Sequence, residues 1–181
     1  MAAPPAYVIQ PLGPQHDRKG FQCGEPSLDE YLQRQVGQDV KRDLAACYVL
    51  TEPESAAILG YYPLSASSAE LHDLPPDLAK KSARYPLVPA VLLGRLAVAR
   101  SAHGRGLGAV LLADALGRAL RTGIGVKLVV VDALSEAAAA FYEHHGFQRF
   151  SDAAMRLFLP VSTFAGPPLD AAITPAGTHD Q

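Results

Sequence analysis

The chain has 181 residues, of which 49% are hydrophobic and 19% are charged, and its formal net charge is −2. This length and apolar content suit one folded domain with a substantial core, and the near-neutral charge argues against a generally basic nucleic-acid binder. No apolar run approaches the roughly 20 residues of a membrane span, and the N-terminus is not signal-like, so we expect a soluble, cytoplasmic protein. Cys23 and Cys47 are too few for a disulfide framework and lack metal-ligand spacing, so we expect no metal site.

The N-terminal half predicts a helix, a hairpin and a long loop. Residues 27–30 match a capping box, which predicts a helix over residues 28–38. Apolar runs at residues 47–51 and 58–65 indicate a β-hairpin. Residues 71–89 are rich in proline and hold one short helical tract, so we expect a loop-rich excursion that lies against the body of the protein.

The C-terminal half alternates strands and helices more regularly. Apolarity and glycine punctuation predict these elements in order: a strand over residues 91–99, a helix over 107–122, a doubly buried strand over 126–131, a helix over 135–145, and short strands over 147–150 and 155–159. Beyond residue 165, alanine, glycine, proline and threonine dominate and leave too little apolar surface to pack. We therefore expect a domain over residues 1–165 and a disordered tail over residues 166–181.

A glycine loop, HGRGLG at residues 103–108, lies between the strand at residues 91–99 and the helix that follows. Glycines allow a ligand to approach the backbone closely and permit positive φ angles. The unpaired N–H groups and the dipole at the start of a helix attract an anion. The pattern therefore predicts a cradle for a diphosphate, without specifying which one.

One interpretation of this loop is a dinucleotide-binding fingerprint. Gly104, Gly106 and Ala109 satisfy G-x-G-x-x-G/A, and Asp132 follows the next strand, near the position of a ribose-binding acid. The context argues against this interpretation, because the fingerprint belongs to the first strand of a repeated βαβ fold, whereas this loop follows a hairpin and precedes one further βα unit. A P-loop is excluded, since no Gly-Lys-Ser/Thr follows the glycines.

The loop, the buried strand at residues 126–131 and the sequence AFYEHHGF at residues 140–147 together resemble the GNAT acyl-CoA N-acyltransferases. The resemblance covers about residues 8–159. It implies an α/β fold whose mixed sheet of six or seven strands is flanked by helices and splayed around residues 91–99 and 126–131. It also implies acetyl-CoA as the acyl donor. The residues that would hold the coenzyme are Leu96, Ala97 and Val98 along its pantetheine, and His103, Gly104, Arg105, Gly106, Leu107 and Gly108 around its pyrophosphate.

Two positions in this resemblance have particular consequences. His103 stands where the family usually has Gln or Arg, a change that leaves a backbone cradle workable. Tyr142 matches the residue that often protonates the departing thiolate. With pKa values of about 10 for tyrosine and about 8.5 for the thiol, that transfer is uphill by roughly 2 kcal/mol. We therefore expect Tyr142 to act at least as a hydrogen-bond donor to the sulfur. The alternative is that Tyr142 is only a packing aromatic.

A finer resemblance lies in three short tracts at residues 21–32, 48–50 and 94–98, which are similar to the GNAT-type toxins of toxin–antitoxin pairs. This resemblance implies acetylation of the α-amino group of an aminoacyl-tRNA, which blocks translation. It also implies a ribbon-helix-helix antitoxin as partner and a homodimer. Arg95 would grip the acceptor end of the RNA, or would simply balance acidic neighbours. Seven further basic residues could meet coenzyme and tRNA phosphates or be solvated: Lys80, Lys81, Arg84, Arg100, Arg105, Arg118 and Arg121.

Two other functions are compatible with the same residues. The chain could be a GNAT acetyltransferase that acts on a small amine or a protein amino group. It could also be a non-catalytic sensor that binds acyl-CoA without consuming it. An amine acceptor suits the predicted chemistry, because an α-amino group with a pKa of about 7.7 to 8.0 has an appreciable neutral fraction near neutral pH and needs no strong general base.

Overall fold

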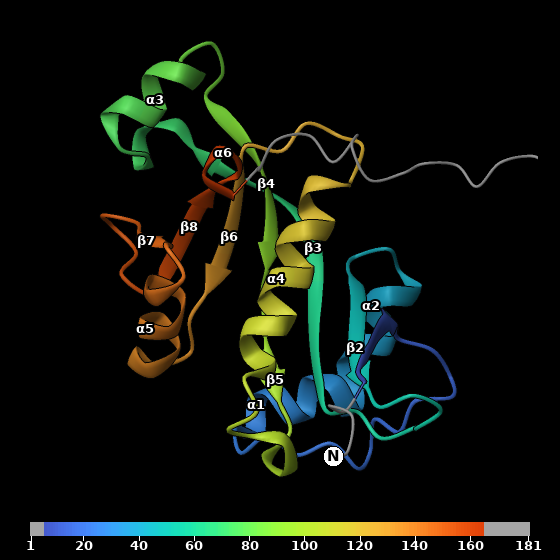
Figure 1. Cartoon of the computed structure of the whole chain (residues 1–181). Coiled ribbons are helices and arrows are strands. Elements are labelled where there is room, and N and C mark those ends of the chain that lie inside the picture. Colours follow the sequence, from blue (N-terminus) through green and yellow to red (C-terminus); the bar gives the residue numbers. More distant parts are fainter. Residues whose placement is uncertain (1–5, 165–181) are drawn as a thin grey trace, which may run out of the picture.

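In the computed structural model, which describes residues 6–164, one mixed β-sheet carries helices on both faces (Figure 1). The spatial order is β1-β2-β3-β4-β6-β8-β7, and β5 pairs with β3. β4 and β6 run parallel, and the other pairs are antiparallel. The predicted mixed sheet is confirmed, with eight strands instead of six or seven. The strands are β1 (Val8–Pro11), β2 (Ala46–Thr51), β3 (Gly60–Glu70), β4 (Leu87–Leu93), β5 (Ala97–Val98), β6 (Leu128–Asp132), β7 (Gln148–Arg149) and β8 (Arg156–Pro160).

The helices differ in length. The longest are α4 (Leu107–Leu120) and α5 (Glu136–His144), which confirm the two helices predicted in the C-terminal half. None of the helices within residues 6–164 is long and apolar enough to cross a membrane. The shorter ones are α1 (Pro26–Glu30), the π-helical turn η1 (Tyr31–Gln35), α2 (Val36–Lys41), η2 (Leu71–Asp73), α3 (Pro76–Ser82), η3 (Arg100–Ala102) and α6 (Val161–Phe164).

Alternation along the strands divides the buried side chains between the two faces of the sheet. In β6, Val129 and Val131 belong to the core beneath α4 and α5, whereas Leu128 and Val130 belong to a core on the opposite face. β6 is thus buried on both faces, as predicted. A third cluster, around Tyr61, packs the segment α1-η1-α2 against β2, β3 and β5.

The predicted N-terminal helix is present, but its capping box is wrong. The helical segment begins at Pro26 with Glu25 as its N-cap, and no side chain caps it. Ser27 lies inside the first turn, and its hydroxyl contacts the Glu25 carboxylate at 3.2 Å. Pro26 explains the shift, because proline favours the first helical position, where its missing N–H costs nothing. Asp29 instead accepts a hydrogen bond of 2.8 Å from the Cys23 N–H and so fixes the chain that enters the helix.

The loop predicted for residues 71–89 is shorter than expected. β3 continues to Glu70, which pairs with Leu87 at the start of β4, so the two strands form a long arm. The helical tract predicted near residue 77 is confirmed as α3. Pro89 fits within β4 because it lies just before the part of β4 that pairs with β6, where its missing N–H removes no ladder bond. Its carbonyl accepts from the Lys127 N–H at 2.9 Å. The predicted disordered tail lies outside the described residues.

The single strand predicted for residues 91–99 is also wrong, because a β-bulge divides it. β4 pairs with β3 up to Leu93, and pairing resumes at Ala97 in β5. Between these points, residues 94–96 lie opposite residues 62–63 alone. Three residues opposite two form a bulge, which bends the strand and changes the side toward which later residues turn their backbone groups.

Pro63 provides a physical reason for the bulge. The Ala99 N–H donates to the Leu59 carbonyl at 2.8 Å, so this pair is hydrogen-bonded. Because such pairs alternate in an antiparallel ladder, Tyr61 and Pro63 also turn their backbone groups toward β5 and the bulge. Proline has no N–H, so the ladder lacks a donor there and regular pairing breaks.

Candidate active site

The first feature of the site is a splay between β4 and β6. The two strands pair up to Leu93, opposite Val131, after which the chain diverges from β6 and continues along β3 as β5. In the ladder between β5 and β3 the backbone groups of Ala97 turn toward β3, so those of Val98 face the gap beside β6. Val98 can therefore pair with an extended ligand, whereas the backbone of Ala97 is already paired and Leu96 lies in the bulge itself.

His103 lies at the same edge of the splay. Its Nε2 is 2.7 Å from the carbonyl oxygen of Val98. A carbonyl can only accept, so Nε2 carries the proton in this contact. The contact uses one of the two lone pairs of the Val98 carbonyl and leaves the other, with the Val98 N–H, for a ligand. The departure from Gln or Arg at position 103 therefore places an imidazole directly on the predicted pantetheine edge.

The glycine loop forms an open cradle between η3 and α4. Gly104 and Gly106 have φ angles of +78° and +73°, which favour glycine, and a Cβ built on either meets no heavy atom within 4 Å. Gly106 is the N-cap of α4, whose first N–H groups have no partner within the helix. Arg105 is exposed, and its guanidinium donates to the Ser101 carbonyl at 3.0 Å. The cradle therefore presents free space and donors to an anion, as a diphosphate requires.

The first turn of α4 also connects the cradle to α5. Leu107 is 2% exposed and packs in the core, so only its backbone can contact the coenzyme. A Cβ built on Gly108 would lie 3.5 Å from the Phe141 ring on α5. The helix that begins at the glycine loop thus touches the helix that carries Tyr142, and the two predicted site regions, far apart in sequence, lie side by side (Figure 1).

Tyr142 is almost completely buried, yet its hydroxyl is available. The residue is 4% exposed, and its ring packs edge-on against Phe141 and Phe147 at centroid distances of 5.3 and 5.5 Å. Among residues 6–164 the hydroxyl has no hydrogen-bond partner, but it is not a buried unpaired atom, so it borders open space. The pKa of Tyr142 is raised above its ordinary value of 10. Burial is the larger cause, and the nearby negative charge of Asp132 is the smaller one. The hydroxyl therefore remains protonated and can donate to a ligand.

Asp132 does not act as the ribose-binding acid of the dinucleotide interpretation. Its carboxylate forms two hydrogen bonds with Arg156 on β8, at 2.8 Å to Nε and 3.3 Å to Nη2. This ion pair joins the ends of β6 and β8. The sheet order, with a single parallel pair, likewise differs from the repeated βαβ fold that the fingerprint requires.

Two of the three tracts that carry the finer resemblance meet at Arg95. This residue lies in the bulge, and its guanidinium carbon is 3.8 Å from the ring centroid of Tyr31, at the start of η1. Among the residues that the structure describes, Arg95 forms no salt bridge, so it does not balance acidic neighbours. Tyr31 was not predicted as a site residue. Its only sequence signal was its place in the tract at residues 21–32.

A polar hollow of about 440 Å³ lies along the same helical segment. Carboxylates, amides and guanidinium groups line it. Two of its lining residues are joined by a backbone hydrogen bond, in which the Arg100 N–H donates to the Gln22 carbonyl at 2.8 Å. The sequence did not predict this hollow, because β5 brings Arg100 beside the N-terminal helix only through its pairing with β3. The lining residues are Gln22, Gly24, Pro26, Asp29, Glu30, Gln33, Arg34 and Arg100.

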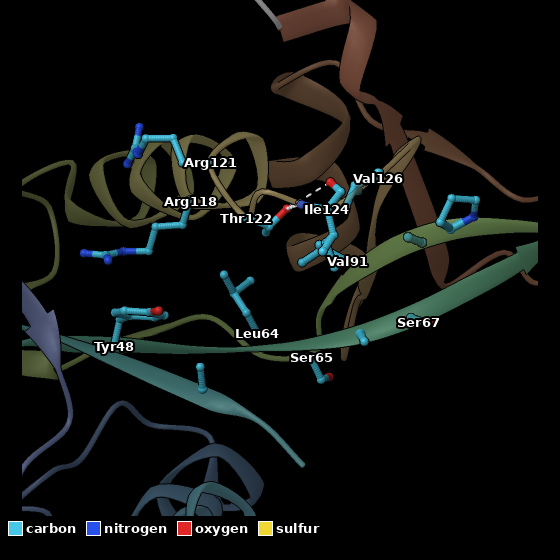
Figure 2. Close-up of a pocket in the computed structure, with 15 residues that line it drawn as sticks. Tyr48, Leu64, Ser65, Ser67, Val91, Arg118, Arg121, Thr122, Ile124 and Val126 are labelled. Atoms are coloured by element: carbon cyan, nitrogen blue, oxygen red, sulfur yellow. Dashed lines mark hydrogen bonds between the residues drawn. The ribbon is translucent and has the colours of Figure 1, made fainter. Parts of the chain in front are cut away.

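Another groove, of about 620 Å³, lies between the C-terminal end of α4 and strands β3 and β4 (Figure 2). Its floor includes Leu64 and Val91, and at one side Arg118 lies over the ring of Tyr48, 3.9 Å from its centroid. None of the predicted coenzyme-binding or catalytic residues lines this groove. Because it lies at the end of α4 away from the glycine loop, it is not the coenzyme site.

The basic residues named in the sequence analysis lie in two groups. Arg100 precedes the glycine loop and Arg105 lies within it, whereas Arg118 and Arg121 lie at the far end of α4, with the α3 region beyond them (Figure 1). The two sets therefore lie at opposite ends of α4.

Comparisons with known proteins identify the family of this chain. The family model for the acetyltransferase (GNAT) domain matches residues 45–149. A tRNA-acetylating toxin of Mycobacterium tuberculosis (strain ATCC 25618 / H37Rv) is 38% identical over 134 residues, 73% of this chain and 78% of the relative. The structure of AtaT complexed with acetyl-methionyl-tRNAfMet superposes with a TM-score of 0.80 at 30% identity, covering 87% of this chain and 96% of that one.

A second AtaT structure is that of a tyrosine-to-phenylalanine variant bound to the C-terminus of the antitoxin AtaR and to acetyl-CoA. It superposes with a TM-score of 0.73 at 28% identity, covering 87% of this chain and 94% of that one. The family match extends from β2 to β7 and includes the strands of the splay, the glycine loop and α5. Because the match spans more than half of the sequence and every element of the predicted coenzyme site, this chain belongs to the GNAT acetyltransferase family.

Proposed function

We propose that this acetyltransferase transfers the acetyl group of acetyl-CoA to the α-amino group of an aminoacyl-tRNA and thereby blocks translation. The observation that carries the proposal is the contact between Arg95 and Tyr31, which joins two of the three toxin-like tracts beside the splay. Relatives support it, since one is a tRNA-acetylating toxin and another is bound to acetyl-methionyl-tRNAfMet.

The residues around the splay fit acetyl-CoA. The glycine cradle offers N–H groups and free space for the pyrophosphate, and Val98 offers backbone partners for the pantetheine amides. These groups would hold the thioester between β5 and β6, on the side toward Tyr142. The AtaT structure that contains acetyl-CoA supports this donor.

The chemistry follows from the protonation states of the acceptor and of Tyr142. The neutral α-amine attacks the thioester carbon, so a C–N bond forms and the C–S bond breaks. Tyr142 donates a hydrogen bond to the sulfur as negative charge develops there. Because its pKa is raised, Tyr142 keeps its proton. The proton lost from the attacking nitrogen can instead neutralise the thiolate. A strong general base is unnecessary for this acceptor.

The acceptor end of the tRNA would lie at the bulge. Arg95 exposes guanidinium donors at that point, and the polar hollow beside η1 provides further donors and acceptors. Lys80, Lys81 and Arg84 lie near α3 and could meet the phosphate backbone of the tRNA body. A localised set of cations can serve RNA binding even though the chain as a whole has a net charge of −2.

The toxin assignment also entails partners. We propose a ribbon-helix-helix antitoxin that neutralises the enzyme, a homodimer as the active form, and a cytoplasmic location where charged tRNA is found. The AtaT variant bound to the C-terminus of AtaR supports the antitoxin. Co-purification with a neighbouring gene product and sedimentation of the free enzyme would test the antitoxin and the dimer separately.

The proposal is tested by incubating the protein with radiolabelled acetyl-CoA and a pool of charged tRNAs, with polyamines and peptides in parallel. Label in the charged tRNA is the expected result, and deacylated tRNA is the matched control because it lacks the amine. Label only in polyamines or peptides would support a different amine acceptor. Binding of acetyl-CoA without label in any acceptor would favour a sensor.

A further inference from the structure

We propose that Tyr31 is a positioning residue for the acceptor, which holds the guanidinium of Arg95 at the bulge by stacking on one of its faces. The inference rests on the proposed function, since it concerns how the acceptor end of the tRNA is gripped. It adds a residue that the coenzyme chemistry does not require.

The first step is the state of Arg95. It is half-buried, and its guanidinium lies 3.8 Å from the centroid of the Tyr31 ring. Stacking occupies the flat face of a guanidinium and leaves the N–H groups at its edge free. Within residues 6–164 no carboxylate forms a salt bridge with Arg95. The side chain is therefore oriented by an aromatic ring while its donors remain available.

The second step is the rigidity of Tyr31. The residue is 3% exposed, and its hydroxyl donates to Asp39 Oδ2 at 3.0 Å. Its ring stacks on Tyr61, with 6.4 Å between centroids and 19° between planes. Tyr61 is itself fixed, because its hydroxyl donates to the Leu28 carbonyl at 2.6 Å. Arg95 thus rests on a ring that is held by its own hydroxyl and by the neighbouring Tyr61 ring.

The third step is the π-helical turn η1, which begins at Tyr31. The Val36 N–H bonds to the Tyr31 carbonyl five residues earlier, instead of the four of an α-helix. The wider turn allows Tyr31, Leu32 and Val36 to be buried together, at 3%, 0% and 0% exposure. π-turns are rare and are often found at functional sites. Here the turn presents the Tyr31 ring toward the bulge without removing its neighbours from the core.

The chemistry of the grip follows from the edge donors of Arg95. A guanidinium fixed in its plane can bind a phosphate through two parallel N–H···O bonds. We therefore assign to Arg95 a phosphate oxygen near the 3′ end of the acceptor strand. Tyr31 does not touch the RNA in this arrangement. It limits the rotamers of Arg95 and so reduces the entropy lost on binding.

The test compares Tyr31→Phe, which keeps the ring, with Tyr31→Leu, which removes the aromatic face and stays apolar. Val36→Ala is the matched control, because it weakens the same buried cluster without touching Arg95. The first readout is the NMR shift of the Arg95 Nε–H, which the Tyr31 ring current displaces. The second is KM for aminoacyl-tRNA at saturating acetyl-CoA, beside KM for acetyl-CoA itself.

In Tyr31→Leu the displaced NMR shift should disappear and KM for aminoacyl-tRNA should rise about tenfold, with KM for acetyl-CoA unchanged. Tyr31→Phe and Val36→Ala should remain within about twofold of wild type in both KM values. Wild-type transfer to tRNA with an unchanged acceptor KM in Tyr31→Leu would overturn the positioning role alone. An equal rise in Val36→Ala would also overturn it, as a stability effect. Absence of wild-type transfer would overturn the proposed function.

Discussion

At the scale of single residues, Tyr142 shows what a sequence motif can and cannot establish. The tract at residues 140–147 identified the tyrosine and its expected role. It did not show that the ring is 4% exposed while the hydroxyl borders open space. That combination depends on Phe147 and on the position of α5 against the sheet. The structure thereby favours hydrogen-bond donation over full proton transfer, because burial raises the pKa of Tyr142 further.

Replacing Tyr142 with phenylalanine should lower kcat about 100-fold, because the developing sulfur charge loses its donor. The dissociation constant for acetyl-CoA should stay within about twofold, since the cradle and β5 are untouched. Tyr85→Phe, at a 64% exposed site away from the splay, is the matched control. Steady-state kinetics and calorimetric titration measure the two quantities. A Tyr142→Phe enzyme with wild-type kcat would remove the donor role.

Tyr31 and Arg95 illustrate a limit of sequence reasoning at the same scale. Each lies in a tract that resembles the toxin family, but 64 positions of chain separate them. Their contact depends on the bulge after β4 and on the π-turn η1, and neither has a local sequence signature. The sequence could therefore point to Arg95 as a binding residue without indicating the ring that orients it.

At the scale of elements, the sequence predicted α4 and α5 to within two residues at each end, because the signals are local. Ser135, for example, accepts a hydrogen bond of 3.1 Å from the Ala138 N–H at the start of α5. The division of the strand at residues 91–99 was missed, because its cause is Pro63 in a neighbouring strand. Long-range pairing decides such features, and a single sequence does not reveal which strands are neighbours.

In the glycine cradle, adding one methyl group at Gly106 should affect stability and coenzyme binding, and a control variant separates the two effects. Gly106→Ala forces a side chain into a positive φ and places a Cβ in the space that the phosphates need, so stability should fall by about 1 to 2 kcal/mol and KM for acetyl-CoA should rise at least tenfold. Gly123→Ala is the matched control, since its φ of +74° and open surroundings are similar. It should lose the same stability and keep its KM. Equal KM values in the two variants would contradict the cradle.

Hydrogen bonds to the Asp114 carboxylate should stabilise the packing of α4 against β3. The Tyr62 hydroxyl and the Arg118 Nε–H both donate to Asp114 Oδ2, the latter at 2.8 Å. Asp114→Ala should lower the free energy of unfolding by about 2 kcal/mol, because it leaves the Tyr62 hydroxyl without a partner. Urea unfolding of this variant, of Tyr62→Phe and of the double variant measures the coupling. Strictly additive losses would show that the two side chains do not act together.

At the scale of the whole molecule, the buried tyrosines predict sensitivity to alkali. Burial is the largest cause that raises the pKa values of Tyr31, Tyr61, Tyr62 and Tyr142 above 10. Since each raised value belongs to the folded state, the stabilisation is complete below about pH 10 and is lost as pH rises toward the folded values.

Chemical unfolding between pH 8 and pH 12 should therefore show a constant contribution from these tyrosines up to about pH 10 and a steep loss above it. The part of the tyrosinate absorbance that belongs to these four buried tyrosines should rise together with unfolding instead of before it. Ionisation of all tyrosines in a protein that remains folded would contradict the prediction.

The whole molecule also explains why the function required more than the glycine loop. In the proposed function the cradle would hold a diphosphate, the splay would hold an extended donor, and the bulge with Arg95 would hold the acceptor. The groove between α4 and β3 is larger than the hollow beside η1, but it contains none of these groups. Chemistry, more than volume, distinguishes the candidate site.

The most direct test of the central claim is the mass of the aminoacyl-adenosine that nuclease releases from charged tRNA after incubation with acetyl-CoA and the enzyme. The account predicts one added acetyl group, located on the α-amino nitrogen by fragmentation, and its loss when the tRNA is deacylated beforehand. An unmodified aminoacyl-adenosine, from enzyme that acetylates another amine under the same conditions, would contradict the account.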